Sequence, residues 1–492
     1  MTSLDHIRIL QIAFQPQKMR TAIILGVTYT IFGLLIICLP TYFSLGLLLI
    51  PLLVVTVIMN PVLGLVGYVL GLSLTQLTLF HIDIPFSPGA DTVNIHQFFL
   101  VLTFFGWSVN LLVKREERLK SSFIYLPTSV LIGYALLTIV WAPDLRVSLL
   151  TFAKISANIL SLFLIIQLVD TEKKQKVVLG AFVLTGIIGA LSVIFTTKAL
   201  LGGAVGLALG EKETIIRVYG LMENTEGLAG LLTQSLFVAL GVVYSLKSTG
   251  KRIFLLCMCI LMFFCIIVTF SRGWLIGCFA GVLFLALRKR NVRAFVLLSG
   301  LVLIFFVALQ LSGGILEKFS HRFVLDVWNL PAEDPRAGRL LLYAGAWQLF
   351  LQSYGLGVGL SGFPLYIGHL FPAKAGMYPH SLYLTILVEL GVVGSMIFVW
   401  WVFILVNHIM RALRVSQESY YQNIFLGWCG GAIAVGLNGF IRLSLAHNWW
   451  AYVALGIVIM SVGLRMDKFN TGRREKGGAR SWLGARKAVG HG

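Results

Sequence analysis

The sequence predicts an all-α, polytopic integral membrane protein with about 12–14 transmembrane helices and one long extracytoplasmic loop. Its 492 residues are 58% hydrophobic and only 12% charged, and the mean hydropathy is +0.89. Soluble domains are nearer half apolar and a quarter charged. The apolar runs are continuous, as in helices that span a bilayer, and do not alternate as membrane β-strands do. Clusters of Lys and Arg also recur at every second loop.

Taken in order, the apolar segments divide the chain into candidate helices. They lie at 21–39, 42–59, 61–80, 95–113, 123–142, 150–169, 177–200, 227–246, 253–270, 274–288, 294–311, 381–408, 423–441 and 449–464. The first follows Arg8, Lys18 and Arg20 without a small-residue cleavage site. That pattern predicts an uncleaved helix and not a signal peptide.

The basic clusters predict the orientation. They occupy 114–120, 173–176, 247–252, 288–293 and 411–414, and the tail after Arg465 is also basic. The intervening loops, such as 81–94 and 201–226, are poorer in Lys and Arg. Cytoplasmic loops collect these residues. We therefore expect a multi-pass protein of the cytoplasmic (inner) membrane, with both termini cytoplasmic and an active site on the extracytoplasmic face.

The same rule accounts for the net charge of +19. Nucleic acid is excluded as a partner, because no basic patch is interleaved with aromatic residues as in single-strand-binding proteins. All cysteines fall inside apolar runs, where they act as small hydrophobes and not as metal ligands. They are Cys38, Cys257, Cys259, Cys265, Cys278 and Cys429.

Three regions follow from this organisation. Residues 1–200 are predicted to be N-terminal transmembrane helices. Residues 201–464 are the candidate catalytic region, and they include the extracytoplasmic loop 312–380. The Gly- and Arg-rich tail 465–492 has no apolar period, which predicts a disordered cytoplasmic segment that touches anionic lipid headgroups.

Two arginines stand at the outer boundary of predicted helices. Arg217 lies in the run Arg217-Val218-Tyr219-Gly220, and Arg272 lies in Ser271-Arg272-Gly273. A guanidinium offers paired donors in one plane and so suits phosphate oxygens, while glycine lets a ligand approach the backbone. The alternative interpretation is that each arginine only extends its head to the membrane interface.

The long loop carries a predicted amphipathic helix. Asp334 and Pro335 resemble a helix start, and Arg336, Arg339, Tyr343 and Trp347 then share one face up to about Gln352. This pattern predicts a helix on the membrane surface, in which Arg336 or Arg339 could also contact phosphate or sugar. The glycine-rich run from Gly355 to Gly362 follows no strand, which argues against a Rossmann nucleotide site.

His380 begins the next predicted helix. Ser381, Thr385 and Glu389 recur every four residues and form one polar stripe, which must face protein or water. An interfacial histidine can be purely structural, but its ordinary pKa near 6.5 suits a general base.

Other residues are expected to serve helix packing. Gly391 and Gly394 would allow helices to approach closely. Hydrogen bonds between helices are expected from His96, Asn110, Asn158 and Asn438.

These motifs, in this order, resemble the O-antigen ligase and polymerase superfamily. The resemblance covers about the C-terminal three-fifths of the chain. It rests on Arg217-x-x-Gly220-x-x-x-Asn224, Ser271-Arg272-Gly273, Arg339 followed by Gly355-Leu356-Gly357-Val358-Gly359, and His380-Ser381-Leu382-Tyr383-Leu384 followed by Glu389-Leu390-Gly391-Val392-Val393-Gly394. Two positions depart from the family pattern, because Glu226 and Ser381 stand where the family often has Asn.

The resemblance implies an inverting, metal-independent membrane glycosyltransferase that needs no cofactor. Its donor would be an undecaprenyl-diphosphate-linked oligosaccharide, and its acceptor a glycan, lipid or protein in contact with membrane lipids. The resemblance assigns His380 as the catalytic base. Substrate binding falls to Arg217, Arg272, Arg339, Arg336, Asn224, Tyr383 and Glu389.

Several alternatives stay open. The superfamily includes ligases, polymerases and transferases to protein, and the sequence does not choose among them. A transporter or lipid-linked glycan flippase is the competing class, although no internal repeat or pair of broken helices favours it. A cell-wall glycan polymerase of the shape-and-division type would share the topology but lacks this order of Arg, Arg and His.

Overall fold

The structure is a computed structural model in which most of the bundle is described. The described residues are 51–75, 78–81, 92–113, 119–200, 207–210, 213–218, 220–222, 224–269, 271–289, 337–371, 374, 376–415, 419–440 and 449–461. The predicted first helix 21–39, the predicted helix 294–311, the loop residues 312–336 (including Arg336), and the tail 465–492 lie outside them. The described part is a bundle of helices with two short strand pairs, which confirms the predicted all-α, polytopic membrane class.

The described part contains the following helices and strands, in chain order. They are α4 (Pro61–Gly71), β1 (Thr78–His81), β2 (Thr92–Asn94), α5 (Ile95–Val113), α6 (Tyr125–Leu137), α7 (Leu145–Leu168), α8 (Glu172–Leu200), β3 (Leu207–Gly210), β4 (Glu213–Val218), α9 (Thr225–Ser245), α10 (Thr249–Val268), α11 (Arg272–Lys289), α14 (Ala337–Gln352), α15 (Phe363–Leu370), α16 (Leu382–Val415) and α17 (Ser419–Gly439). A 3-10 turn, Thr138–Trp141, extends α6, and a further apolar helix spans Trp449–Ser461. Each strand pair is antiparallel.

Six helices in the described part are long and apolar enough to cross a membrane: α5, α7, the Glu172–Phe195 part of α8, α9, α10 and α16. The described parts of the predicted segments 42–59 and 61–80 form one bent pair of helices and not two independent spans. The helix Pro51–Met59 and α4 meet at a bend of 118°. Asn60 caps α4 by accepting a hydrogen bond from the Val62 amide, and Pro61 has no amide hydrogen to continue the preceding helix.

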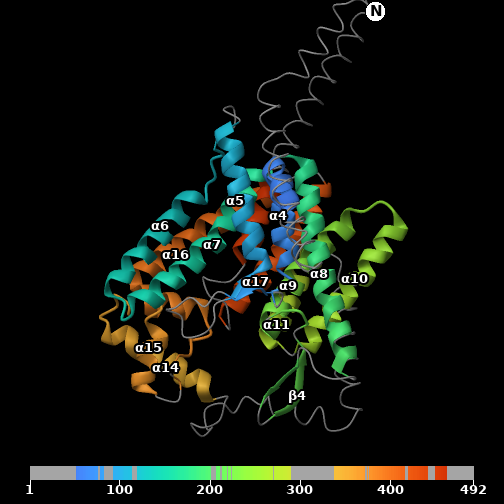
Figure 1. Ribbon diagram of the computed structural model, residues 1–492. Coiled ribbons are helices and arrows are strands. Elements are labelled where there is room, and N and C mark those ends of the chain that lie inside the picture. Colours follow the sequence, from blue (N-terminus) through green and yellow to red (C-terminus); the bar gives the residue numbers. More distant parts are fainter. Residues whose placement is uncertain are drawn as a thin grey trace, which may run out of the picture.

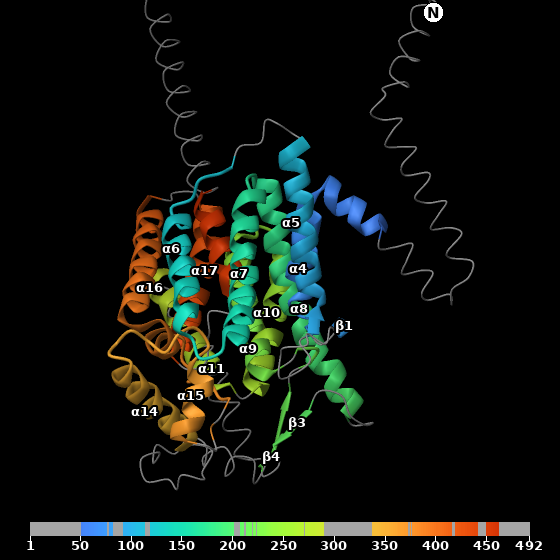
Figure 2. The same cartoon turned by 60° about the vertical axis from the view of Figure 1, so that its left-hand side comes forward.

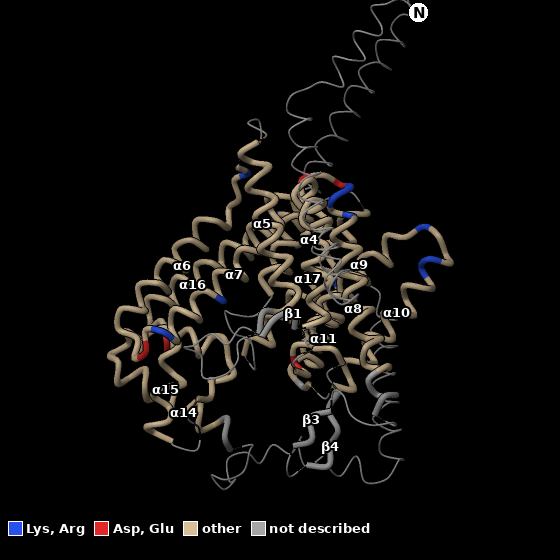
Figure 3. Tube along the Cα trace, in the orientation of Figure 1, with Lys and Arg blue, Asp and Glu red and all other residues tan. Residues whose placement is uncertain are grey.

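The bundle has two distinct ends. The basic end is where α7 ends and α8 begins, around Lys120, Asp170 and Lys174, which are joined by ion pairs. Figure 3 shows Lys and Arg along this upper end of the bundle. The motif end is the opposite one, where α7, α9, α11 and α16 begin. It also carries α14, α15 and the β3–β4 hairpin, as both views in Figures 1 and 2 show. The structure therefore separates the predicted basic loops from the predicted site motifs.

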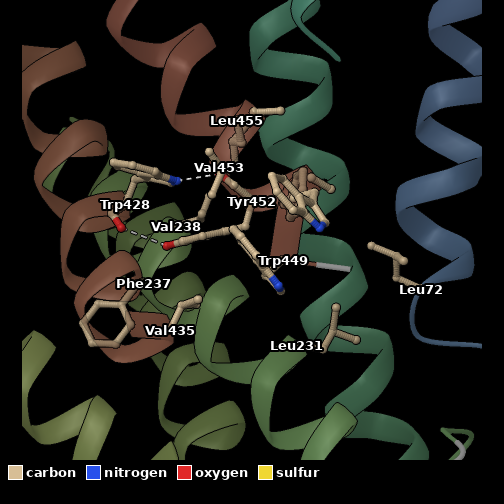
Figure 4. Packing of buried hydrophobic residues seen from close by; sticks show 14 of the residues in the cluster. Leu72, Leu231, Phe237, Val238, Trp428, Val435, Trp449, Tyr452, Val453 and Leu455 are labelled. Carbon is tan, nitrogen blue, oxygen red and sulfur yellow. Dashed lines mark hydrogen bonds between the residues drawn. The ribbon is translucent and has the colours of Figure 1, made fainter. Parts of the chain in front are cut away.

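The main core lies where α9, α11 and α17 pack together. Small residues let the backbones approach: a Cβ on Gly277 would lie 2.9 Å from the Ala434 Cα, and one on Gly281 would lie 2.5 Å from the Gly430 carbonyl oxygen. Next to this seam, Trp428 Nε1 donates to the Tyr452 carbonyl at 2.7 Å, and the Tyr452 hydroxyl donates to the Trp428 carbonyl at 3.0 Å (Figure 4).

A second, smaller core joins α14, α15 and the beginning of α16. Its buried residues are Leu342, Ala346, Leu349, Val358, Phe363, Ile367 and Val388. The predicted loop 312–380 is thus a packed helical cap over its described part. Helix α14 buries Leu342 and Ala346, while Trp347 on another face is 52% exposed. Its predicted place on the membrane surface stays a prediction.

Candidate functional site

His380 stands at the entrance to α16 in an unusual backbone conformation. Its φ is +55°, in the left-handed region that side chains with a Cβ rarely adopt. The preceding Pro379 is buried and His380 itself is half-buried. Ser381 then caps α16, because its hydroxyl accepts from the Leu384 amide at 3.4 Å and its carbonyl accepts from the Thr385 amide at 2.9 Å. The predicted helix start is therefore confirmed.

The helix that begins after His380 is broken at Gly391, whose φ is 69° and ψ is −164°. The glycine-rich run supplies the missing backbone partners. Val358 N donates to the Val388 carbonyl at 2.8 Å, and Gly359 N donates to the Glu389 carbonyl at 3.0 Å. Val392 N in turn donates to the Gly355 carbonyl at 2.9 Å. A loop 30 to 37 residues upstream thus completes the hydrogen bonding of the break.

This arrangement corrects the expectation that Gly391 serves helix–helix packing. A Cβ on Gly391 would lie 2.4 Å from the Gly355 carbonyl oxygen, and one on Gly357 would lie 2.5 Å from the Gly391 nitrogen. Both glycines have positive φ. Backbone is packed directly on backbone, so the glycine run is a structural partner of α16.

The N-terminal half of the chain anchors the same loop. Trp141 Nε1 donates to the Gly357 carbonyl at 3.2 Å, and the Ser148 hydroxyl donates to the Leu360 carbonyl at 2.7 Å. Ser361, which also has positive φ, donates its hydroxyl hydrogen to Thr151 Oγ1 at 2.7 Å. Sequence reasoning placed these helices outside the site. The signal that could have found them is the group of polar residues at the start of α7.

The predicted polar stripe on α16 does face protein. Ser381, Thr385 and Glu389 are all buried. Within the described residues, Glu389 Oε1 has no hydrogen-bond partner. Tyr378 is 40% exposed, and desolvation of its partly buried side chain, followed by the nearby charge of Glu389, raises its pKa above the ordinary value, against the effect of its hydrogen bonds with Ser361 and Thr151. The segment just before His380 is thereby tied to the glycine run and to α7.

A second group of motif residues meets at the starts of α9 and α11. Asn224 caps α9, since its Oδ1 accepts from the Gly227 amide at 2.6 Å. The Ser271 hydroxyl donates to Glu226 Oε2. Glu226, one of the two departures from the family pattern, therefore links the two motifs that carry Arg217 and Arg272.

The predicted arginines fall on elements of the motif end. Arg217 lies on β4, where it pairs in register with Ala208 of β3. Arg272 is the first residue of α11, and Arg339 lies in the first turn of α14. Arg336 is outside the described residues. The backbone thus brings three of the four predicted arginines to the end that carries His380.

Helix α17 connects the two groups. The Tyr383 hydroxyl, near the start of α16, donates to the Gly436 carbonyl of α17 at 2.9 Å. On its other side α17 packs against α11 through Ala434 and Gly277. The helix after His380 and the helix that begins at Arg272 are therefore held by one common partner.

Only some of the hydrogen bonds predicted between helices are present among the described residues. Asn110 Nδ2 donates to the Ile58 carbonyl at 2.5 Å and so joins two helices, as expected. Asn158 donates to the Lys154 carbonyl of its own helix at 3.0 Å. Among the described residues, His96 Nδ1 and Asn438 Oδ1 have no hydrogen-bond partner.

Comparison with known proteins adds independent support. Residues 257–399 match the family model described as O-antigen ligase. The resemblance to the O-antigen ligase and polymerase superfamily is confirmed. The region that matches the O-antigen ligase family runs from α10 into α16. It includes α11, the glycine-rich run and His380.

A curated relative points the same way over more of the chain. The teichuronic acid biosynthesis protein TuaE of Bacillus subtilis (strain 168) is 23% identical over 350 residues, which are 67% of this chain and 70% of that protein. Together with the O-antigen ligase match, this similarity supports a membrane enzyme that ligates or polymerises glycans. Arg217 and Asn224 precede the matched range 257–399, whereas Arg272, Arg339 and His380 lie within it.

Proposed function

We propose that this protein transfers or polymerises a glycan from an undecaprenyl-diphosphate-linked donor to an acceptor hydroxyl at the outer face of the cytoplasmic membrane. The observation that carries this proposal is the backbone of His380. A non-glycine residue held at φ +55° costs free energy, and such strain is concentrated at functional sites. The surrounding hydrogen bonds of Ser381 and the glycine run hold that conformation in place.

In the proposed reaction, His380 is the general base. The imidazole takes the proton of the acceptor hydroxyl as its oxygen attacks the anomeric carbon of the donor sugar. The bond from that carbon to the diphosphate oxygen breaks, and the electron pair leaves with undecaprenyl diphosphate. Attack from the face opposite the leaving group inverts the anomeric carbon. The reaction needs no metal if protein cations stabilise the departing charge.

Arg217 and Arg272 are proposed to bind the diphosphate, with Arg339 and Arg336 as further contacts to phosphate or sugar. Their planar guanidinium groups can pair with two phosphate oxygens at once. The Ser271–Glu226 hydrogen bond supports this assignment, because it fixes the start of α11 against the start of α9. Substitution of Arg217 or Arg272 by Lys should restore only part of the donor use lost in the Ala variants, since Lys lacks the planar fork.

The remaining predicted contacts have different support. Asn224 and Tyr383 already make structural hydrogen bonds, so we propose that they position α9 and α16 around the substrate. Glu389 is buried in line with Ser381 and Thr385, and its Oε1 has no partner among the described residues. We propose that Glu389 contacts the glycan, as the family resemblance implies.

The role of the relative TuaE in teichuronic acid biosynthesis favours polymer assembly over transfer to a protein acceptor. Purified protein would be supplied with a lipid-linked oligosaccharide in detergent, without added metal. Wild-type protein is expected to release undecaprenyl diphosphate and to lengthen or transfer the glycan, and His380→Ala is expected to be inactive.

The matched control is His369→Ala, because His369 is an exposed histidine of the neighbouring helix α15. It should retain wild-type turnover. If the wild-type protein leaves the lipid intact but moves a substrate across a proteoliposome membrane, the proposal fails and the transporter alternative replaces it.

A further inference from the structure

Two fully buried side chains at the motif end have polar atoms without a partner. Trp274 is 2% exposed and Asn438 is 1% exposed. Within the described part of the chain, neither Trp274 Nε1 nor Asn438 Oδ1 has a hydrogen-bond partner. Burying such a group unpaired costs free energy, and most buried polar groups in native proteins are paired. A reason for keeping both groups is therefore required.

The two side chains belong to one seam. Helices α11 and α17 run antiparallel, with Gly277 against Ala434 and Gly281 against Gly430. Trp274 is one turn beyond Gly277 towards the motif end, and Asn438 is one turn beyond Ala434 in the same direction. Residues one turn apart share a helix face. The indole and the amide thus occupy the same level of the seam. The Trp274 ring also contacts α9, since a Cβ on Gly230 would lie 2.6 Å from its Cζ2.

This level adjoins both parts of the proposed site. Arg272 precedes Trp274 by two residues at the start of α11. Close to Asn438, the Gly436 carbonyl accepts the Tyr383 hydroxyl hydrogen, and Tyr383 follows His380 by three residues. Helices α11 and α17, which carry the two unpartnered groups, therefore also include the residue proposed to bind diphosphate and contact the helix that follows the proposed base.

The complementary chemistry identifies a ligand class. An indole N–H can only donate, and an amide oxygen can only accept. A hydroxyl group accepts and donates at the same time, so a single hydroxyl can satisfy both. We propose that Trp274 Nε1 and Asn438 Oδ1 form a subsite for a hydroxyl of the sugar attached to the diphosphate of the donor. Because both groups are buried, binding includes a local opening of the seam at its motif end.

This inference rests on the proposed function and deepens it. A purely structural origin makes a different prediction. If the two groups are only a defect of packing, apolar replacements will cost less stability than the loss of a paired group and will not change donor use. If they bind the sugar, the same replacements will have that same effect on the stability of the free protein, but will weaken its use of the donor.

The test compares Trp274→Phe and Asn438→Leu with two matched controls. In the controls, Trp428→Phe and Asn110→Leu, the lost groups are paired: Trp428 Nε1 with the Tyr452 carbonyl and Asn110 Nδ2 with the Ile58 carbonyl. Thermal unfolding and turnover of a synthetic undecaprenyl-diphosphate-linked disaccharide are measured for all four. For Trp274→Phe and Asn438→Leu we expect a smaller loss of Tm than in the matched controls, because no hydrogen bond is lost, and a KM raised about five- to thirty-fold. The controls should lower Tm and leave KM unchanged.

A set of disaccharide donors, each lacking one hydroxyl of the first sugar, identifies the contact. One deoxy donor should be poor for the wild-type enzyme but no worse than the parent donor for Trp274→Phe, because the two changes remove the same interaction. A loss of Tm in Trp274→Phe and Asn438→Leu as large as in the matched controls, or an unchanged KM, overturns the subsite. If Trp274→Phe instead removes the penalty of an acceptor that lacks one hydroxyl, the assignment of the subsite to the donor is overturned. Absence of turnover by wild-type protein sinks the proposed function, and the subsite is then decided by whether the donor raises the Tm of wild type more than that of Trp274→Phe.

Discussion

At the basic end, ordinary helices are joined by side chains, whereas at the motif end the backbone itself adopts unusual conformations. Asp170 pairs with Lys120 at 3.1 Å and with Lys174 at 2.8 Å. Within the described residues, the non-glycine residues with positive φ are Tyr354, Ser361 and His380, all at the motif end. The difference teaches that, among the described residues, the non-glycine residues in the left-handed backbone conformation gather where the candidate site is.

The largest expected effect comes from a substitution that disrupts the close contact between two backbone segments at the motif end. Gly357→Ala places a Cβ 2.5 Å from the Gly391 nitrogen and 2.6 Å from the Glu389 carbonyl oxygen, at a φ of +86°. Because both neighbours are backbone, we expect a loss of roughly 3–5 kcal/mol in the free energy of unfolding. The control is Gly250→Ala in the first turn of α10 at the basic end, which has open space around it. It should gain up to about 1 kcal/mol. Similar thermal shifts for both variants would contradict the comparison.

The second effect compares a position just before α16 with a position near the other end of the same helix. At His380, Gly should give a more stable protein than Ala by about 1–2 kcal/mol, because only Gly adopts the left-handed conformation without strain. At Arg411, an exposed position in the regular basic end of α16, the order should reverse, with Ala favoured by about 0.5–1 kcal/mol. Thermal unfolding of the four variants gives both differences. The same sign at both positions would refute stored strain at His380.

A smaller effect tests the ion pairs of the basic end. Burial alone would raise the pKa of Asp170, but its hydrogen bonds with Lys174 and Lys120 and their charges outweigh burial and hold that pKa below 3.8. A carboxyl with a lowered folded-state pKa contributes stability above its ordinary pKa, and this contribution is lost as pH falls through the lowered value. Asp170→Asn should cost up to about 1 kcal/mol at neutral pH, because the groups are partly exposed. The difference between Asn and wild type should vanish in acid. An unchanged difference would exclude the ion pairs as its cause.

The smallest effect concerns a pair on the surface of α8. Lys176 and Glu172 are 2.5 Å apart at (i, i+4) spacing, and both are more than one-third exposed. Lys176→Gln should cost about 0.3–0.5 kcal/mol at low salt. The cost should disappear in 1 M salt, where charges are screened within about 3 Å. A cost that survives high salt would point to packing of Lys176 over the Tyr420 ring, 5.3 Å away.

Hydropathy and charge were sufficient to predict the membrane class, most helix positions and the separation of the two ends, because these properties are local or periodic. The start of α16 after His380 and the burial of Glu389 were predictable for the same reason. The break at Gly391 was not, since residues 381–408 read as one apolar run and the partner backbone comes from Gly355 to Gly359. Nor was the support from Trp141 and Thr151, which approach the site only through tertiary packing. The side-chain roles proposed for the arginines stay predictions.

The break in α16 also bears on the order in which the protein is assembled. The segment before Gly391, Leu382–Leu390, has only nine residues, and nine residues rise about 13 Å, less than half of a hydrocarbon core of about 30 Å. The longer segment after Gly391 can insert into the bilayer by itself. The short segment gains its backbone partners only when residues 355–359 have folded against it. We therefore expect His380 to reach the conformation at the start of α16 late in biogenesis, after membrane insertion. If His380 is the proposed base, protein that has entered the bilayer but not yet docked this loop is expected to be inactive.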